Sequence, residues 1–243
     1  MEMSAASGLP IYDGGPADVI FNWGGGGRSV PRKSVVLNRN PIFNKYSQAK
    51  AMFDSGVATP RPYRLIEAVK KFPVVRKPIN SYGGHGIRLV RSAKTVNGRY
   101  NFWYQDLVNK DREFRVYFFT GEVCMVEEKL VKDKSELTWN LRNCLRWNRY
   151  RELEDSKVIE DLVIPAAKSI GIDWGAADVL MDKREKFWIC EINSRPSCWG
   201  GLKPKLNMKT RNGIYELINN DRSELDLSAR MWANRMGAFI NNL

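Results

Sequence analysis

Two apolar-rich runs joined by a short polar turn constrain this chain more than any other feature of its sequence. The runs cover residues 175–182 and 187–196, and the turn between them reads Asp-Lys-Arg-Glu. This pattern predicts an antiparallel β-hairpin, in which residues two apart on one strand face the same side. Glu191 and Asn193 therefore project together, and Asp178 can meet them from the partner strand.

Carboxylate and amide oxygens gathered in this way are ligands that Mg²⁺ prefers when it also holds nucleotide phosphates. The hairpin alone leaves two interpretations open: a metal site formed by these three side chains, or a solvated polar face on an edge hairpin. Two neighbours are expected to lie outside such a site. Asp182 is on the turn, where we expect it to be solvated, and Cys190 should face the opposite side of the strand and join the core.

The composition indicates a basic globular protein. The chain has 243 residues, enough for one large domain or two small ones, and its 43% of hydrophobic residues suffice to build a core. The net charge of +12 favours anionic partners: nucleotides, nucleic acid, acidic peptides or a membrane surface. Four cysteines without a Cys-x-x-Cys pair, beside a single histidine, argue against a zinc site and indicate reduced thiols.

Reduced cysteines favour the cytoplasm. The N-terminus has neither the basic start nor the apolar stretch of a signal peptide, and we find no apolar run long enough to span a membrane. We therefore expect a cytoplasmic protein with no membrane partner.

Short strands and hairpins dominate the rest of the pattern. Helices are expected over 44–56, 61–71, 156–170 and 228–243, and strands over 19–23, 74–79, 86–90, 102–105, 114–119 and 122–127, in addition to the hairpin. This arrangement predicts an α+β fold with antiparallel sheets rather than a doubly wound parallel sheet.

A strand, a Gly-rich loop and a second strand follow one another over residues 73–90. Lys77 lies on the strand that enters the loop, where its ammonium can pair with phosphates, and the glycines let backbone N–H groups approach phosphate oxygens. The glycines are not followed by Lys and Ser or Thr, so the segment is not a Walker A loop. It resembles the flap over the phosphates in kinases, and a plain structural turn remains the alternative.

Two further segments could contact a ligand. Residues 103–117 form an apolar strand, a polar hinge and a strand with Glu113 and Arg115, so the hinge backbone could meet a base edge and the carboxylate could take ribose hydroxyls. Residues 139–151 are rich in arginine. If this segment is helical, Arg142, Arg146 and Arg149 share one face, which is either an anion clamp or a solvated surface.

The order of these pieces resembles the ATP-grasp superfamily. The pieces are Asn44-Lys45 opening a helix, Lys77 before the Gly-rich loop, Gln105-Asp-Leu-Val, Glu113-Phe-Arg-Val, Asp178, and Glu191-Ile-Asn193. The resemblance covers roughly residues 44–196 and is greatest to the branch with D-alanine–D-alanine ligase and the ribosomal-protein glutamate ligases. It implies two α+β subdomains that hold ATP between antiparallel sheets. The parts would be a short N-terminal segment (1–43), a small subdomain with the flap (44–110) and a large subdomain with the metal hairpin and a C-terminal helix (111–243).

The resemblance also implies ligands and roles, with ATP and Mg²⁺, or Mn²⁺ in its place, as cofactors. Residues that would hold the phosphates are Lys45, Lys77 and the flap residues Ser81, Gly83, Gly84 and Gly86. Residues that would hold the nucleoside are Gln105, Asp106, Leu107 and Val108 at adenine and Glu113 at the ribose. Asp178, Glu191 and Asn193 would bind the metal. Lys77 and Arg115 would act on the reacting groups. Arg195, which follows Glu191-Ile-Asn193, could meet a substrate carboxylate or stay solvated.

The implied reaction joins a carboxylate to an amine at the expense of ATP, through an acylphosphate, and the partners would be small-molecule or peptide substrates. Two departures leave the substrates open. The segment before Lys45 is short, so the domain that usually precedes it in the family is minimal or replaced, and Ala176 stands where the D-alanine ligase branch has an arginine. The basic segments keep an alternative open: a nucleic-acid-associated ATP-grasp protein that modifies or binds a polyanionic partner.

Overall fold

We describe a computed structural model of the chain. It describes residues 17–22, 33–79, 84–96, 101–131, 133–139, 144–148, 156–194, 231 and 234–243. The chain divides into two compact units, which are described separately. The larger unit comprises Asn22–Gly24 and Leu37–Arg195, and the smaller comprises Met1–Phe21, Gly25–Val36 and Pro196–Leu243.

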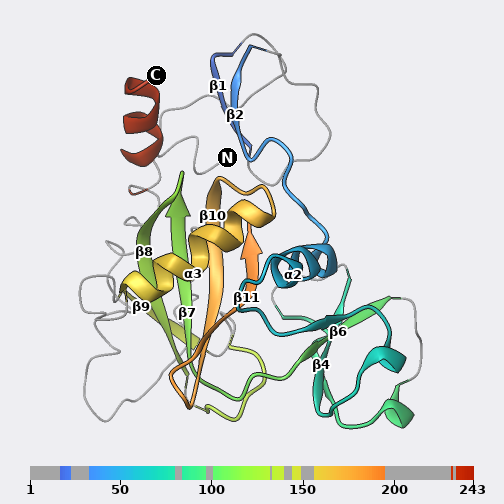
Figure 1. Cartoon of the computed structure of the whole chain (residues 1–243). Helices are drawn as coiled ribbons and strands as arrows, with labels where there is room; N and C mark the ends of the chain where they lie inside the picture. Colours follow the sequence, from blue (N-terminus) through green and yellow to red (C-terminus); the bar gives the residue numbers. More distant parts are fainter. Residues whose placement is uncertain are drawn as a thin grey trace, which may run out of the picture. The chain divides into compact units, whose positions relative to one another are not determined.

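A five-stranded antiparallel sheet forms the centre of the larger unit. Its strands are β7 (Lys110–Phe119), β8 (Glu122–Val131), β9 (Cys144–Asn148), β10 (Trp174–Asp182) and β11 (Phe187–Asn193). Their order in the sheet is β11-β10-β7-β8-β9. Helix α3 (Ser156–Ser169) connects β9 to β10 and lies across one face of this sheet (Figure 1).

The core of the unit lies between α3 and the sheet. Phe114, Val116 and Phe118 on β7 form one buried cluster with Ile159 and Val163 of α3. Each such fully buried side chain contributes roughly 1.5–3 kcal/mol to stability. Because side chains alternate across a strand, the polar residues between the apolar ones of β7 face the other side of the sheet.

A four-stranded antiparallel sheet precedes the larger one in the chain. Its strands are β3 (Pro62–Tyr63), β4 (Val74–Pro78), β5 (Arg88–Val90) and β6 (Phe102–Asp106), in the order β3-β6-β4-β5. Short 3₁₀ helices cover Ile66–Ala68 and Ala93–Thr95. A second, smaller buried cluster backs this sheet and contains Ile66, Val74, Val90 and Tyr104. Residues 107–109 join β6 to β7, and we call them the hinge.

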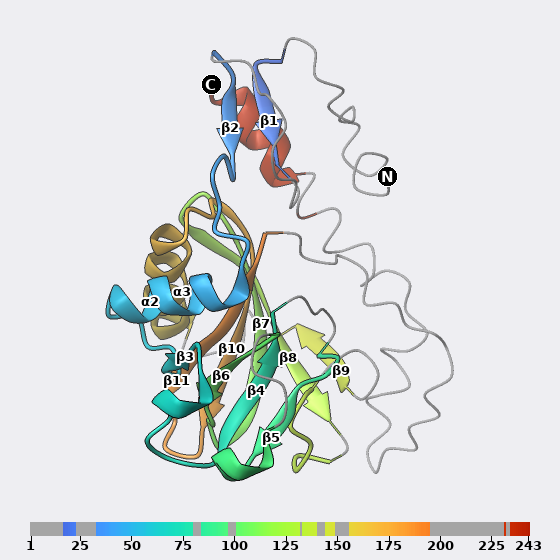
Figure 2. The same cartoon turned by 90° about the vertical axis from the view of Figure 1, so that its right-hand side faces the viewer.

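Helix α2 (Lys45–Asp54) begins as the sequence predicts. The Asn44 side chain accepts a hydrogen bond from the backbone N–H of Ser47, which caps the first turn. The helix ends before Gly56, whose positive φ of 77° suits glycine. Figure 2 shows α2 and α3 on the same side of the five-stranded sheet.

The smaller unit contains a two-stranded sheet and a helix. The strands are β1 (Val19–Phe21) and β2 (Val35–Leu37), the last residue of which belongs to the larger unit. Residues 234–241 are helical, within the range predicted for the C-terminal helix. The rings of Phe21 and Phe239 meet edge to face, with centroids 6.2 Å apart. Among the described residues, no helix is long and apolar enough to cross a membrane.

The helix predicted over residues 61–71 is wrong. Residues 61–71 contain strand β3 and a short 3₁₀ helix instead. Pro62 lacks the N–H that a helix needs and disfavours a helical conformation at Arg61, whose carbonyl accepts from the N–H of Asp106. The Arg-rich segment contains strand β9, which pairs with the outer edge of β8. Arg146 therefore lies on a strand and cannot form the helical face, while Arg142 and Arg149 lie outside the described residues.

The other predicted elements within the described residues are present, and the hairpin of residues 174–193 is antiparallel as expected. The division predicted from the sequence, with boundaries after residues 43 and 110, follows the two large sheets rather than the two compact units, and it stays a prediction.

Candidate functional site

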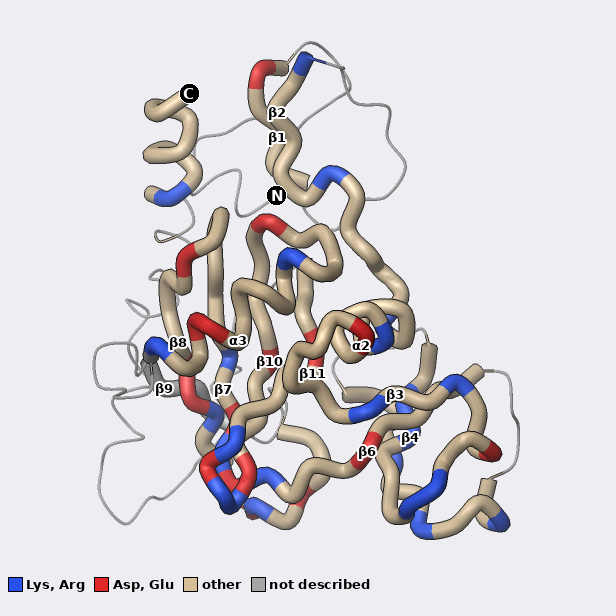
Figure 3. Tube along the Cα trace, viewed as in Figure 1, with Lys and Arg blue, Asp and Glu red and all other residues tan. Residues whose placement is uncertain are grey.

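Charged side chains gather on the face of the five-stranded sheet opposite to α3, which we call the charged face. Strand pairing places Asp178 between Glu191 on β11 and Arg115 on β7, and Arg115 is in turn paired with Glu127 on β8. Four neighbouring strands thus contribute one charged residue each to a single row. Acidic and basic positions are also interleaved at the start of β7 and in the β10–β11 turn (Figure 3).

A β-bulge on β11 decides which side chains reach this face. Asp178 pairs with Glu191 and Val179 pairs with Ile189, so Cys190 has no partner on β10. The bulge keeps Ile189 and Ile192 in the core and turns both Cys190 and Glu191 to the charged face. The expectation that Cys190 joins the core is therefore wrong. Core residues at 187, 189 and 192 break the two-residue repeat, and this break was the signal in the sequence.

Glu113 and Asp178 are held by buried cations. The ammonium of Lys129 on β8 lies 2.5 Å from Glu113 Oε1 and 3.0 Å from Asp178 Oδ1. Lys110 lies 2.5 Å from the other oxygen of Glu113, and Arg115 Nη1 donates to both oxygens of Asp178 at 3.1 Å. The five side chains are at most 11% exposed. They form one buried ionic network on the charged face.

Electrostatics keeps the cations of this network charged. Burial by itself would lower the pKa of the Lys129 ammonium, but Asp178 and Glu113 together raise that pKa above its ordinary value. Burial and Asp178 oppose each other in the same way at Arg115, where the pKa is also raised. Sequence reasoning missed Lys129 because Glu-Glu-Lys at the end of a predicted strand is also typical of a solvated edge. Only the pairing of β7 with β8 and β10 shows that this lysine is buried.

Lys45 on α2 contacts the two predicted metal ligands on β11. Its ammonium donates to Asn193 Oδ1 at 2.7 Å and lies 3.9 Å from Glu191 Oε2. The Asn193 amide also donates to Glu191 Oε1 at 2.9 Å. Lys45 lowers the pKa of the Glu191 carboxyl, against the effects of burial and of Asp178. Glu191 therefore stays ionised.

Lys77 brings the two sheets together. Its ammonium, on β4, donates to Gln105 Oε1 at 2.6 Å and lies 3.4 Å from Cys190 Sγ on β11. Burial raises the pKa of the Cys190 thiol although Lys77 opposes the shift. Trp103 lies beside Lys77 on β6, with the ammonium 5.1 Å from its ring centroid.

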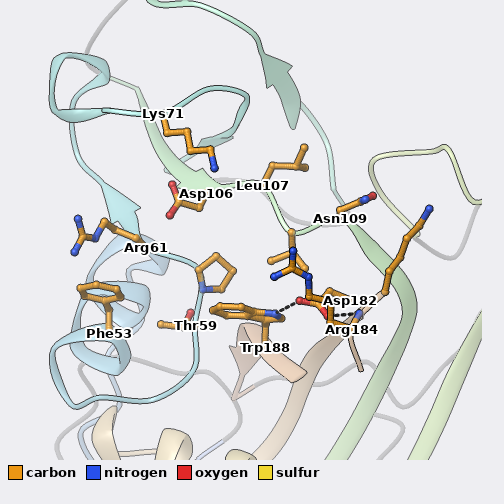
Figure 4. Close-up of a pocket in the computed structure, with 13 residues that line it drawn as sticks. Phe53, Thr59, Arg61, Lys71, Asp106, Leu107, Asn109, Asp182, Arg184 and Trp188 are labelled. Carbon is orange, nitrogen blue, oxygen red and sulfur yellow. Dashed lines mark hydrogen bonds between the residues drawn. The ribbon is translucent and has the colours of Figure 1, made fainter. Parts of the chain in front are cut away.

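The residues predicted to contact adenine do not all face the same way. Gln105 accepts from Lys77, whereas the next residue, Asp106, accepts from the Tyr63 hydroxyl at 2.9 Å. A cavity of about 710 Å³ lies next to the hinge and is lined by Asp106, Leu107 and Val108 together with segment 59–61 and the β10–β11 turn. Figure 4 shows Asp106 and Leu107 on one side of it and Trp188 on the other.

This cavity is distinct from the charged face. Of the predicted nucleotide and metal residues that the structure describes, only Asp106, Leu107 and Val108 line it. Asp182 also lines it, and its carboxylate is not simply solvated as predicted. It accepts from the backbone N–H groups of Arg184 and Lys186 and from Trp188 Nε1, which closes the β10–β11 turn.

The flap is described in part. Gly84 and Gly86 both have positive φ, and a Cβ on Gly86 would lie 2.9 Å from the ring of Pro78. Glycine is thus required there by the backbone. Ser81, Gly83 and Arg195 lie outside the described residues.

The charged face offers a set of oxygen donors that suits Mg²⁺. Asp178, Glu191 and Asn193 share this face, and oxygen-only ligands are those that Mg²⁺ prefers. The described residues contain no group of three His, Cys, Asp or Glu arranged for a metal, so the amide of Asn193 is needed to complete the set. Arg115 Nε is buried and has no hydrogen-bond partner within the described part of the chain, which leaves a donor for a phosphate oxygen.

No protein-family model matches this sequence, and no curated protein matches it. Solved structures do match. The ATP-grasp ligase PsnB in complex with a minimal precursor is 20% identical and superimposes with a TM-score of 0.52 over 69% of this chain. The same ligase with precursor, Mg and ADP is 18% identical, with a TM-score of 0.52 over 84% of the chain. Carboxyaminoimidazole ribonucleotide synthase from Aspergillus clavatus, complexed with ATP, is 15% identical, with a TM-score of 0.50 over 67% of the chain and 48% of its own.

The chain has the ATP-grasp fold. This confirms the α+β class with antiparallel sheets that the sequence predicts. The ATP-grasp match covers 58% and 63% of the two PsnB chains, so this chain spans less than two thirds of their length.

Proposed function

We propose that the protein is an ATP-dependent ligase that joins a carboxylate to an amine through an acylphosphate, releasing ADP and phosphate. One observation carries the proposal. Within an ATP-grasp fold, the charged face, α2 and the adjoining β4 bring together six residues from five elements: Lys45, Lys77, Glu113, Asp178, Glu191 and Asn193. These residue types match the needs of a magnesium nucleotide: cations for phosphates, a carboxylate for ribose and oxygen donors for the metal.

The chain's own residues have separate tasks in this proposal. Lys77 and Lys45 neutralise phosphate oxygens, and the glycine loop after β4 covers them. Glu113 accepts from the ribose hydroxyls, and the hinge backbone holds adenine. Arg115 uses its buried Nε to stabilise charge on the transferred phosphoryl group. Asp178, Glu191 and Asn193 would hold Mg²⁺, which supplies neutralisation of the phosphate charge when bound.

The reaction takes place in two displacements. An oxygen of the substrate carboxylate attacks the γ-phosphorus, and the bond to the bridging oxygen breaks as ADP leaves. The amine nitrogen then attacks the acyl carbon, the bond to the phosphate oxygen breaks, and phosphate leaves with the electron pair while the amine loses a proton. No side chain serves as a nucleophile in either step.

A peptide is the carboxylate substrate we favour. The PsnB structures contain a precursor peptide, and they match this chain over more of its length than the synthase does. A cytoplasmic location is consistent with the supply of ATP and stays part of the proposal.

Phosphate release tests the reaction. We expect release of phosphate from ATP that requires both an amine and a carboxylate, in a screen of amino acids against acidic peptides with Mg²⁺ or Mn²⁺. Lys77→Met should weaken binding of ADP by about tenfold or more, because it removes a cation from the phosphates. Lys50→Gln is the matched control, since the partner of Lys50 among the described residues is Asp54, in an exposed ion pair of 2.5 Å on α2.

The outcomes test nucleotide binding and the ligase reaction separately. Equal ADP affinity in the wild type and in Lys77→Met would contradict the nucleotide assignment. Phosphate release that proceeds at the same rate without an amine or carboxylate would contradict the ligase assignment and leave an ATPase.

A further inference from the structure

One buried ammonium bridges the two carboxylates that serve different parts of the proposed magnesium nucleotide. Lys129 contacts Glu113, the proposed ribose ligand, at 2.5 Å and Asp178, the proposed metal ligand, at 3.0 Å. Its side chain is 9% exposed. The same positive charge therefore neutralises the proposed ribose ligand and the proposed metal ligand at once.

Each carboxylate has a second cation as well. Lys110 pairs with Glu113 and Arg115 pairs with Asp178, so the two acids are surrounded by three buried cations. A divalent cation that approaches Asp178 without a nucleotide finds both carboxylate oxygens already held by Arg115 Nη1 and one of them also by Lys129, and these two charges repel it at short range. Glu191 offers little compensation, because Lys45 already lies beside it.

We propose that Lys129 couples metal binding to nucleotide binding. It neutralises Glu113 and Asp178 together in the free protein, and the phosphates of an arriving nucleotide draw its ammonium away. Asp178 then has an oxygen for the metal and Glu113 has one for the ribose. The metal accordingly enters with the nucleotide and binds poorly before it.

The buried donors support this exchange of partners. The phosphates bring negative charge that can take over the Lys129 ammonium, and Arg115 Nε offers them a buried donor that has no partner among the described residues. Thermodynamic linkage makes the effect reciprocal, so the nucleotide tightens metal binding by the same factor as the metal tightens nucleotide binding. The inference rests on the proposed function, because it requires a nucleotide on the charged face.

Binding of Mn²⁺ to the protein, followed by the electron paramagnetic resonance signal of the free ion and corrected for the Mn²⁺–ADP complex measured without protein, reports the coupling without turnover. In the wild type we expect Mn²⁺ to bind at least about tenfold more tightly with saturating ADP than without nucleotide. In Lys129→Gln we expect Mn²⁺ to bind about tenfold more tightly without nucleotide than it does to the wild type, because one repelling charge is gone. The ratio of the Mn²⁺ affinity with ADP to the Mn²⁺ affinity without it should therefore be smaller in Lys129→Gln than in the wild type.

Two further variants control the measurement. Lys129→Arg keeps the charge and should keep most of the wild-type coupling. Lys134→Gln removes an exposed lysine that pairs with Asp111 at 3.1 Å, and it should change nothing. Folding of Lys129→Gln is checked by circular dichroism, and we expect it to fold because Lys110 and Arg115 still neutralise the two acids.

Three results would overturn the inference. The first is a wild type that binds Mn²⁺ equally well with and without ADP, which leaves the proposed function standing. The second is a folded Lys129→Gln with wild-type coupling. The third is no Mn²⁺ binding even with ADP, which would remove the proposed function together with the inference. If Lys129→Gln does not fold, the double variant Lys129→Gln/Glu113→Gln, which removes the ion pair as a whole, is measured without nucleotide in its place, and Mn²⁺ binding no tighter than in the wild type would overturn the inference.

Discussion

At the scale of single residues, Asn38 shows how one side chain secures the larger unit. It is fully buried, has a positive φ of 55°, and accepts from the backbone N–H groups of Asp173 and Trp174 at the start of β10. Its amide also donates to the carbonyl oxygens of Trp174 and Asn22. Positive φ is tolerated by asparagine better than by most residues.

We expect Asn38→Ala to lower the free energy of unfolding by about 2–4 kcal/mol, because it leaves buried backbone groups without partners. Urea denaturation measures the loss. Asn109→Ala, at an exposed hinge position, should cost little and serves as the control. Equal costs for the two variants would contradict the role given to Asn38.

Cys190 offers a second test at this scale. Burial raises the pKa of its thiol, so less thiolate is present at a given pH than on an ordinary cysteine. Both cysteines are half-buried, but iodoacetamide should modify Cys190 more slowly than Cys124 at pH 7–8 because of the raised pKa, and ADP should slow it further. Peptide mass spectrometry after timed labelling distinguishes the two sites. Faster labelling of Cys190 would mean that Lys77 outweighs burial.

At the scale of elements, close contact between β10 and β11 sets the position of Asn193. A Cβ on Gly175 would lie 2.4 Å from the carbonyl oxygen of Asn193, which is backbone and cannot rotate away. Glycine is therefore needed where β10 passes the end of β11.

Gly175→Ala should destabilise the protein by about 1–3 kcal/mol through overpacking. It should also weaken the Mg²⁺-dependent part of ADP binding, because it displaces Asn193. Thermal unfolding and calorimetric titration of ADP measure the two effects. Gly237→Ala is the control: its Cβ would meet nothing within 4 Å, and alanine favours the helix. Loss of stability without loss of Mg²⁺ dependence would argue against Asn193 as a metal ligand.

At the scale of the whole molecule, the larger unit is expected to unfold at a higher temperature when a nucleotide is bound. A ligand that binds only the native state stabilises it by about 2.7 kcal/mol at a free concentration of 100 times Kd. ADP with Mg²⁺ should therefore raise the Tm measured by scanning calorimetry, and Mg²⁺ alone should not. In Glu191→Gln the part of the shift that depends on Mg²⁺ should disappear. A Tm that does not change when ADP is added would contradict the proposed site.

The sequence by itself determined the elements whose signals are local. A cap at Asn44, a glycine after α2, and alternating apolar residues around a polar turn act within a few residues, so α2 and the β10–β11 hairpin could be predicted with most of their site residues. The order of motifs then indicated the ATP-grasp fold, which the solved structures confirm.

Only the tertiary structure decided features that depend on a partner far along the chain. The bulge that turns Cys190 to the charged face follows from the register with β10. β9 is a strand because it pairs with β8, and residues 61–71 are extended where β3 pairs with β6. Lys129 is a buried bridge because Glu113 and Asp178 approach it from two other strands. The sequence shows which side chains are charged. Whether such a side chain is buried, and which counter-ions it contacts, depends on neighbours that only strand pairing brings together.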